Sequence, residues 1–135
     1  MANLDNRVLI DSYKIPLVFM VLHAFLAAMW NAAGVWLISQ GQSPLGPTAS
    51  LTGVAVLAVF IVIYIFTLKK GYEKSFLLMA FIGALVGLMT IYGALTKDHS
   101  FWPSEFWRIA GIAINSLAVI GFVLTLKVFF QRKNH

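Results

Sequence analysis

Four apolar runs, each about as long as a membrane-spanning helix, dominate this chain and limit how it can fold. They cover residues 15–38, 51–68, 75–95 and 106–126. A helix rises 1.5 Å per residue, so about 20 residues cross the ~30 Å hydrocarbon core of a bilayer. The runs contain no Asp or Glu, and their only Lys or Arg is Arg108, whose long side chain can reach the membrane surface. The lipid bilayer is therefore the expected solvent.

Composition and connection lengths favour an all-α membrane protein made of one domain. Hydrophobic residues make up 60% of the 135-residue chain and charged residues 11%, against about 25% charged residues in soluble domains. The runs do not alternate polar and apolar residues as barrel strands do. The connections between them are too short to hold a soluble domain. We predict an up-down bundle of four transmembrane helices that occupies residues 1–135.

The basic residues predict how the chain is oriented in its membrane. Only Lys97 and Arg108 fall on one side of the predicted spans. The other eight fall on the opposite side: Arg7, Lys14, Lys69, Lys70, Lys74, Lys127, Arg132 and Lys133. Cytoplasmic loops carry an excess of Lys and Arg, so both termini are predicted to be cytoplasmic, in a bacterial inner membrane. Basic residues that flank apolar runs indicate topology, and no nucleic-acid partner is expected.

Small residues recur at helical spacing and predict where the helices meet. The hydrophobic effect does not drive helices together in lipid, so close approach of backbones matters. The predicted packing positions lie on three of the four spans: Ala24, Ala28, Ala32, Gly83, Gly87 and Gly111. The span 51–68 has fewer small residues and many β-branched ones. We expect it to be the helix most exposed to lipid.

Four polar side chains within the apolar runs form a candidate intramembrane site: His23, Asn31, Thr90 and Asn115. Counted from the outer boundary, Asn31 and Thr90 fall at similar depths, and Asn115 lies slightly deeper. His23 lies deeper still. An ionisable residue within a span is a functional candidate. The alternative is that these groups only form hydrogen bonds between helices, worth about 0.6–2 kcal/mol each.

Aromatic residues gather near the predicted outer surface: Trp36, Phe101, Trp102, Phe106 and Trp107. Aromatic rings are enriched at the two interfaces of a membrane, so we predict an aromatic belt. A ligand-binding rim is the alternative interpretation.

Several chemistries lack the residues that they need. The chain has no cysteine, which excludes disulfides and thiolate metal sites. No span holds a carboxylate of the kind that small proton-coupled exporters use, and one histidine within the spans does not supply bis-histidine haem ligation. Asp98, His99 and Glu105 form a loop trio without a nucleophile, which is a weak signal for an enzyme. We expect no cofactor, no metal and no catalytic activity.

These observations favour a small multi-pass membrane protein that acts by helix association. It would serve as an accessory, assembly or immunity-type component, with a membrane-protein partner or as a homo-oligomer. The alternative is a small oligomeric transporter or channel whose path is lined by the polar groups, since four short helices barely enclose a path of their own. A membrane enzyme is the third hypothesis.

Overall fold

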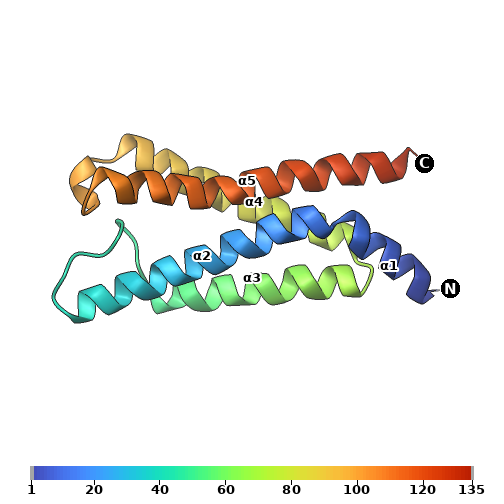
Figure 1. Ribbon diagram of the computed structural model, residues 1–135, viewed down its shortest axis with the longest axis horizontal. Helices are drawn as coiled ribbons and strands as arrows, with labels where there is room; N and C mark the ends of the chain where they lie inside the picture. Colours follow the sequence, from blue (N-terminus) through green and yellow to red (C-terminus); the bar gives the residue numbers. More distant parts are fainter. Residues whose placement is uncertain (1, 135) are drawn as a thin grey trace.

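The computed structural model describes residues 2–134 and confirms an all-α bundle with four long apolar helices (Figure 1). The elements are α1 (Ala2–Ser12), α2 (Lys14–Ser39), α3 (Leu51–Lys69), α4 (Glu73–Thr96), the short 3-10 helix η1 (His99–Phe101) and α5 (Glu105–Lys133). Helices α2 to α5 are each long and apolar enough to cross a membrane. They contain the four predicted spans.

Two helical segments extend beyond the predicted spans. Helix α5 continues past residue 126 to Lys133, because no Gly or Pro interrupts this stretch and basic residues in its last turn favour a helix C-terminus. Helix α1 is too short to be stable alone. It is held by tertiary contacts: Leu9 is buried against the bundle, and the Asn6 amide donates a hydrogen bond to the Lys69 carbonyl oxygen at 3.5 Å.

The helix boundaries have local causes. The Ser50 hydroxyl accepts a hydrogen bond from the Gly53 N–H at 2.9 Å, which caps the start of α3. Gly71 has a φ of +77°, a conformation that glycine adopts without strain, and it allows the tight turn from α3 into α4. Ser104 lies in extended backbone before α5, and so does Trp102, whose conformation Pro103 restricts.

The four long helices run alternately up and down (Figure 1). Helix α2 packs against α3 and α5, and α4 packs against α5 and, over a smaller contact, against α3. The order around the bundle is therefore α2, α3, α4, α5. Both chain termini lie at one end of the bundle, which we call the terminal end (Figure 1). The other end, with residues 40–50 and 97–104, is the loop end.

The large buried side chains gather in the half of the bundle near the terminal end. Tyr13, Met20, Tyr64 and Phe76 are fully buried there. The Phe76 ring meets Tyr13 and Tyr64 edge to face, with centroid separations of 5.4 and 6.0 Å. Edge-to-face contacts of this kind add to the gain from burial. This cluster joins all four long helices and α1 at one end of the molecule.

Small residues occupy the closest helix contacts. A Cβ on Gly87 would lie 2.8 Å from the Asn115 backbone oxygen, and one on Gly83 would lie 2.5 Å from the Tyr64 hydroxyl. Ala24 is buried, whereas Ala28 and Ala32 are half-buried. A Cβ on Gly111 would lie 3.7 Å from the Trp30 ring, an ordinary contact distance, so this position has room for a methyl group.

Helix α3 does not stand out as the most exposed span. It buries Tyr64, Thr67 and Leu68, all near the terminal end, and α5 likewise buries three residues. Helix α5 is about as exposed as α3, because the long α5 also has a wide face that points away from the bundle.

Candidate functional site

A cavity of about 520 Å³ lies in the loop-end half of the bundle. All four polar residues of the predicted site line it: His23, Asn31, Thr90 and Asn115. The rest of the wall comes from the four long helices, from the 97–104 connection and from the 40–50 segment, which folds back between the two helix pairs (Figure 1). Small residues on the facing helices, such as Ala27, Gly93 and Ala94, leave this space unfilled.

The cavity opens sideways between α3 and α4. Val56 of α3 is 48% exposed, and Val86 and Met89 of α4 are 50% and 74% exposed, although all three line the cavity. Contact between the two helices occurs near the terminal end, where the Tyr64 hydroxyl donates a hydrogen bond to the Met79 carbonyl oxygen at 3.5 Å. The bulky Tyr64–Phe76 cluster holds the helices together there. Toward the loop end, exposed aliphatic side chains border a gap.

His23 and Asn115 form the polar floor of the cavity. The Asn115 amide donates a hydrogen bond to the Gly111 carbonyl oxygen at 2.8 Å, which leaves its own oxygen free to accept. This oxygen lies 3.4 Å from His23 Nε2, so the imidazole must donate through Nε2. In a neutral imidazole Nδ1 is then an acceptor. His23 Nδ1 is buried without a hydrogen-bond partner among the described residues.

The other two polar residues have local partners. Asn31 accepts a hydrogen bond from the Ser50 N–H at 3.2 Å and donates one to the Ala27 carbonyl oxygen at 2.9 Å. It thus ties α2 to the start of α3. Thr90 is exposed and donates to the Val86 carbonyl oxygen of its own helix at 3.0 Å. All four polar groups thus line the same cavity. Among the described residues, the only hydrogen bond between two of the four is the one from His23 to Asn115.

Two tryptophans close the cavity at the loop end. A Cβ on Gly46 would lie 3.2 Å from the indole nitrogen of Trp102 and 3.4 Å from that of Trp30. Trp102 is only 7% exposed, so its assignment to a lipid-facing aromatic belt was wrong. The chain turns inward at η1 and places this ring over the cavity. Trp36, Phe101 and Phe106 are exposed, as the belt requires.

Trp30, Lys97 and Trp102 line the cavity and were not among the predicted site residues. A signal for Trp30 exists, because His23, Ala27, Trp30 and Asn31 have the i, i+4, i+7, i+8 spacing of one helix face. Trp102 and Lys97 lie in or beside an irregular connection, where periodicity gives no such signal. Their position follows from the path of the loop.

Two members of the loop trio, His99 and Glu105, contact each other in an exposed polar network that Asp98 does not join. His99 Nδ1 lies 3.4 Å from a Glu105 carboxylate oxygen, and Glu105 pairs with Arg108. Arg108 also donates a hydrogen bond to the Ala94 carbonyl oxygen at 3.0 Å. The guanidinium therefore reaches the loop end, as expected for a basic residue in the first turn of a span. No group of three metal-ligating side chains occurs within residues 2–134.

A second polar cluster lies at the terminal end. The Tyr13 hydroxyl donates a hydrogen bond to Glu73 at 2.7 Å, and Arg132 contacts the same Glu73 oxygen at 3.1 Å. Burial of Tyr13, together with its bond to the Glu73 carboxylate, raises the pKa of the phenol. Arg132 also donates to the Ser12 hydroxyl at 3.3 Å. This cluster fastens the start of α4 and the end of α5 to the junction of α1 and α2.

The fold and site define a four-helix bundle of candidate membrane spans with a side-opening polar cavity. No protein family, curated protein or solved structure matches the chain.

Proposed function

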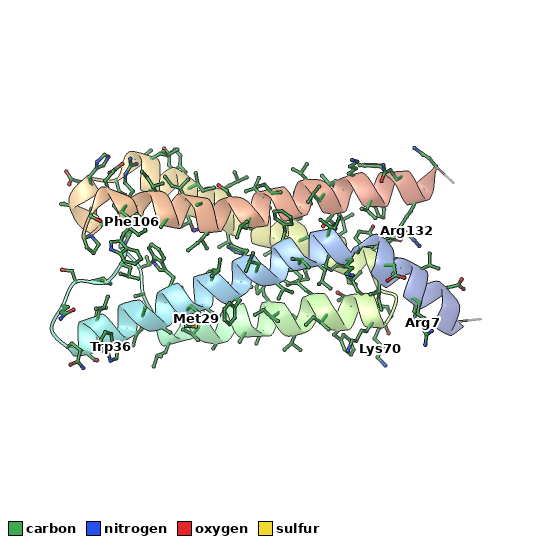
Figure 2. The ribbon with its side chains drawn as sticks, viewed as in Figure 1. Arg7, Met29, Trp36, Lys70, Phe106 and Arg132 are labelled. Atoms are coloured by element: carbon green, nitrogen blue, oxygen red, sulfur yellow. The ribbon has the colours of Figure 1, made fainter. Side chains whose placement is uncertain are left out.

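We propose that the chain is a single-domain, multi-pass protein of the bacterial inner membrane with both termini in the cytoplasm. The charge difference between the ends of the bundle supports this orientation. Arg7, Lys70 and Arg132 lie at the terminal end, whereas Trp36 and Phe106 lie at the loop end (Figure 2). Lys97 and Arg108 are the only Lys or Arg residues at the loop end. A positive terminal end is the expected cytoplasmic side.

Within this orientation, the protein acts as a non-catalytic binding protein or carrier for a small molecule of the bilayer. The observation that carries this proposal is the cavity of about 520 Å³ that opens between α3 and α4. Binding pockets have volumes of roughly 300–1,000 Å³ and combine apolar walls with a few polar groups. Here aliphatic side chains border the opening, and polar groups lie at both ends of the cavity. A ligand dissolved in lipid could enter without crossing water.

Helix association receives less support from the bundle. Gly83 and Gly87 lie inside it, against Tyr64 and Asn115, so they offer no contact face to a second protein. Ala24 is likewise buried. Release of a ligand on the far side of the membrane would still need a second copy or a membrane-protein partner, because four short helices barely enclose a path.

The test compares two substitutions on the same helix. Thr90→Phe places a large ring at the opening between α3 and α4, whereas Leu88→Phe adds the same ring at an exposed position outside the cavity. We expect the parent and Leu88→Phe to retain a lipid-soluble molecule after purification in mild detergent, detected by native mass spectrometry, and Thr90→Phe to lose it. Equal retention by both variants would contradict binding in the cavity. A stoichiometric protein partner in place of a small molecule would favour the accessory function instead.

A further inference from the structure

We propose that the ligand of the cavity is an anionic amphiphile. Its carboxylate or phosphate head group is held at the loop end by Lys97 and by the indole N–H groups of Trp30 and Trp102. Its hydrocarbon chain lies in the opening between α3 and α4. This inference rests on the proposed binding function and names the class of ligand.

Three hydrogen-bond donors line the loop end of the cavity without a partner in the described part of the chain. Lys97, Trp30 and Trp102 all border the space. None of the side-chain hydrogen bonds and salt bridges among the described residues uses the Lys97 ammonium or either indole N–H. Ammonium and indole N–H groups donate and do not accept. The groups available here therefore suit an acceptor such as a carboxylate or phosphate oxygen.

The two indole groups converge on one small residue. Gly46 lies between them, and a Cβ there would come within 3.2 Å of the Trp102 nitrogen and 3.4 Å of the Trp30 nitrogen. Any side chain at position 46 would thus crowd the space beside both donors. Because Gly46 has no side chain, the space beside the two indole nitrogens stays open.

The cavity wall carries one positive charge at the loop end. Lys97 is the charged residue in the described wall. The nearby carboxylates have other partners: Asp98 accepts from the Ser100 N–H at 2.8 Å, and Glu105 pairs with Arg108 and His99. Hydrogen bonds in which one group is ionised are stronger than neutral ones. An anion is therefore favoured over a neutral head group.

The geometry also matches the way in which a lipid lies in a leaflet. The three donors are at the loop end, where α4 ends and the membrane surface is expected, whereas Val56, Val86 and Met89 border the opening farther along the bundle. A head group at the donors would leave its chain to run along this opening. A free anion would use the donors and gain nothing from the aliphatic border.

The experiment measures quenching of tryptophan fluorescence by dibromostearate in a neutral detergent at pH 8. Two probes act as controls: the methyl ester of dibromostearate, which keeps the chain and lacks the charge, and acetate, which keeps the carboxylate and lacks the chain. We expect saturable quenching by dibromostearate, with half-saturation at a concentration roughly tenfold lower than for the ester. The reason is that the charged carboxylate forms hydrogen bonds that the ester lacks. Acetate should not displace it.

Two variants test the head-group site. Lys97→Gln should weaken dibromostearate binding roughly three- to tenfold, because the lost contact is to a charged group that is partly screened by solvent. Lys70→Gln, at the terminal end, removes the same charge away from the cavity and should bind as the parent does. Gly46→Ala should also weaken binding without any change in charge, since its methyl group would crowd both indoles.

The outcomes separate this inference from the proposed function. Equal binding of acid and ester, with Lys97→Gln unchanged, would overturn the anionic head group and leave a neutral ligand in the cavity. Displacement of dibromostearate by acetate would overturn the amphiphile and indicate a site for free anions. Absence of saturable quenching by both brominated probes would overturn the proposed function itself.

Discussion

At the scale of single residues, the hydrogen bond between His23 and Asn115 joins α2 to α5 and leaves one imbalance. Asn115 has its amide group and its oxygen engaged, whereas His23 has an unpaired, buried Nδ1. An unsatisfied buried polar group costs about 1–3 kcal/mol. The two partners are therefore unequal. His23 has one unpaired buried nitrogen, and the hydrogen bond to Asn115 prevents its second nitrogen from being unpaired as well.

This inequality predicts an order of stability. Asn115→Leu leaves both nitrogens of the buried His23 ring unpaired, so it should be the more destabilising single change, by roughly 1–3 kcal/mol. His23→Leu removes the hydrogen bond and the unpaired Nδ1 together, so its loss should be smaller. The double variant should recover part of the loss seen in Asn115→Leu. Thermal aggregation midpoints in one detergent measure all three. A lower midpoint for His23→Leu than for Asn115→Leu would contradict this assignment of donor and acceptor.

At the scale of helices, α4 and α5 approach each other closely at Gly87. A Cβ there would lie 2.8 Å from the Asn115 backbone oxygen and 3.3 Å from the Ala118 methyl group. A backbone atom cannot change rotamer to make room, as a flexible side chain can. The contact between these helices therefore depends on a residue without a side chain.

Enlarging this position should separate the two helices. Gly87→Leu is expected to cost more than the roughly 1–3 kcal/mol typical of overpacking, because the obstacle is backbone. Val59→Leu, on the exposed face of α3, is the matched control and should be nearly silent. The measurement is the thermal aggregation midpoint of each variant. Equal midpoints for Gly87→Leu and the parent would show that α4 presents another face to α5.

The spans could be predicted from the sequence, and the other elements could not. Lipid allows no unpaired backbone, so each crossing must be a long apolar helix, and that pattern is plain in residues 51–68 and 75–95. Helix α1 depends on Leu9 and Asn6 meeting the bundle, which local sequence does not reveal. The sequence predicts Trp102 to be an interfacial ring, but the path of the loop places this ring over the cavity.

The sequence points to the four polar residues, but not to the cavity that they line. His23, Asn31, Thr90 and Asn115 are visible as polar residues in apolar runs, and all four line the cavity. The cavity itself arises because bulky Tyr64 and Phe76 fill one half of the bundle. Small residues fill the other half incompletely. Which half of the bundle is tightly filled depends on the order of helices around it, and the spacing of small residues does not specify that order.

At the scale of the whole molecule, the proposed orientation makes a direct prediction. Reporter fusions at His135 and after Lys70 should read cytoplasmic, and a fusion after Gln42 should read external, because the excess of basic residues lies on the side of the termini. Alkaline phosphatase and green fluorescent protein fusions provide the two readouts. An external reading at His135 would overturn the orientation and would place the loop end of the bundle on the cytoplasmic side.

The concentration of large side chains at the terminal end has a mechanical consequence. Tyr13, Tyr64 and Phe76 act as a fulcrum for α3 and α4, whose far ends border the opening of the cavity. Over roughly 20 Å of helix, a rotation of about 3° at the fulcrum moves the far end by about 1 Å. Helices α3 and α4 can thus part at the opening while the contact of α2 with α5 is kept. The width of the gap is then governed from the opposite end of the molecule, by residues that a ligand never touches.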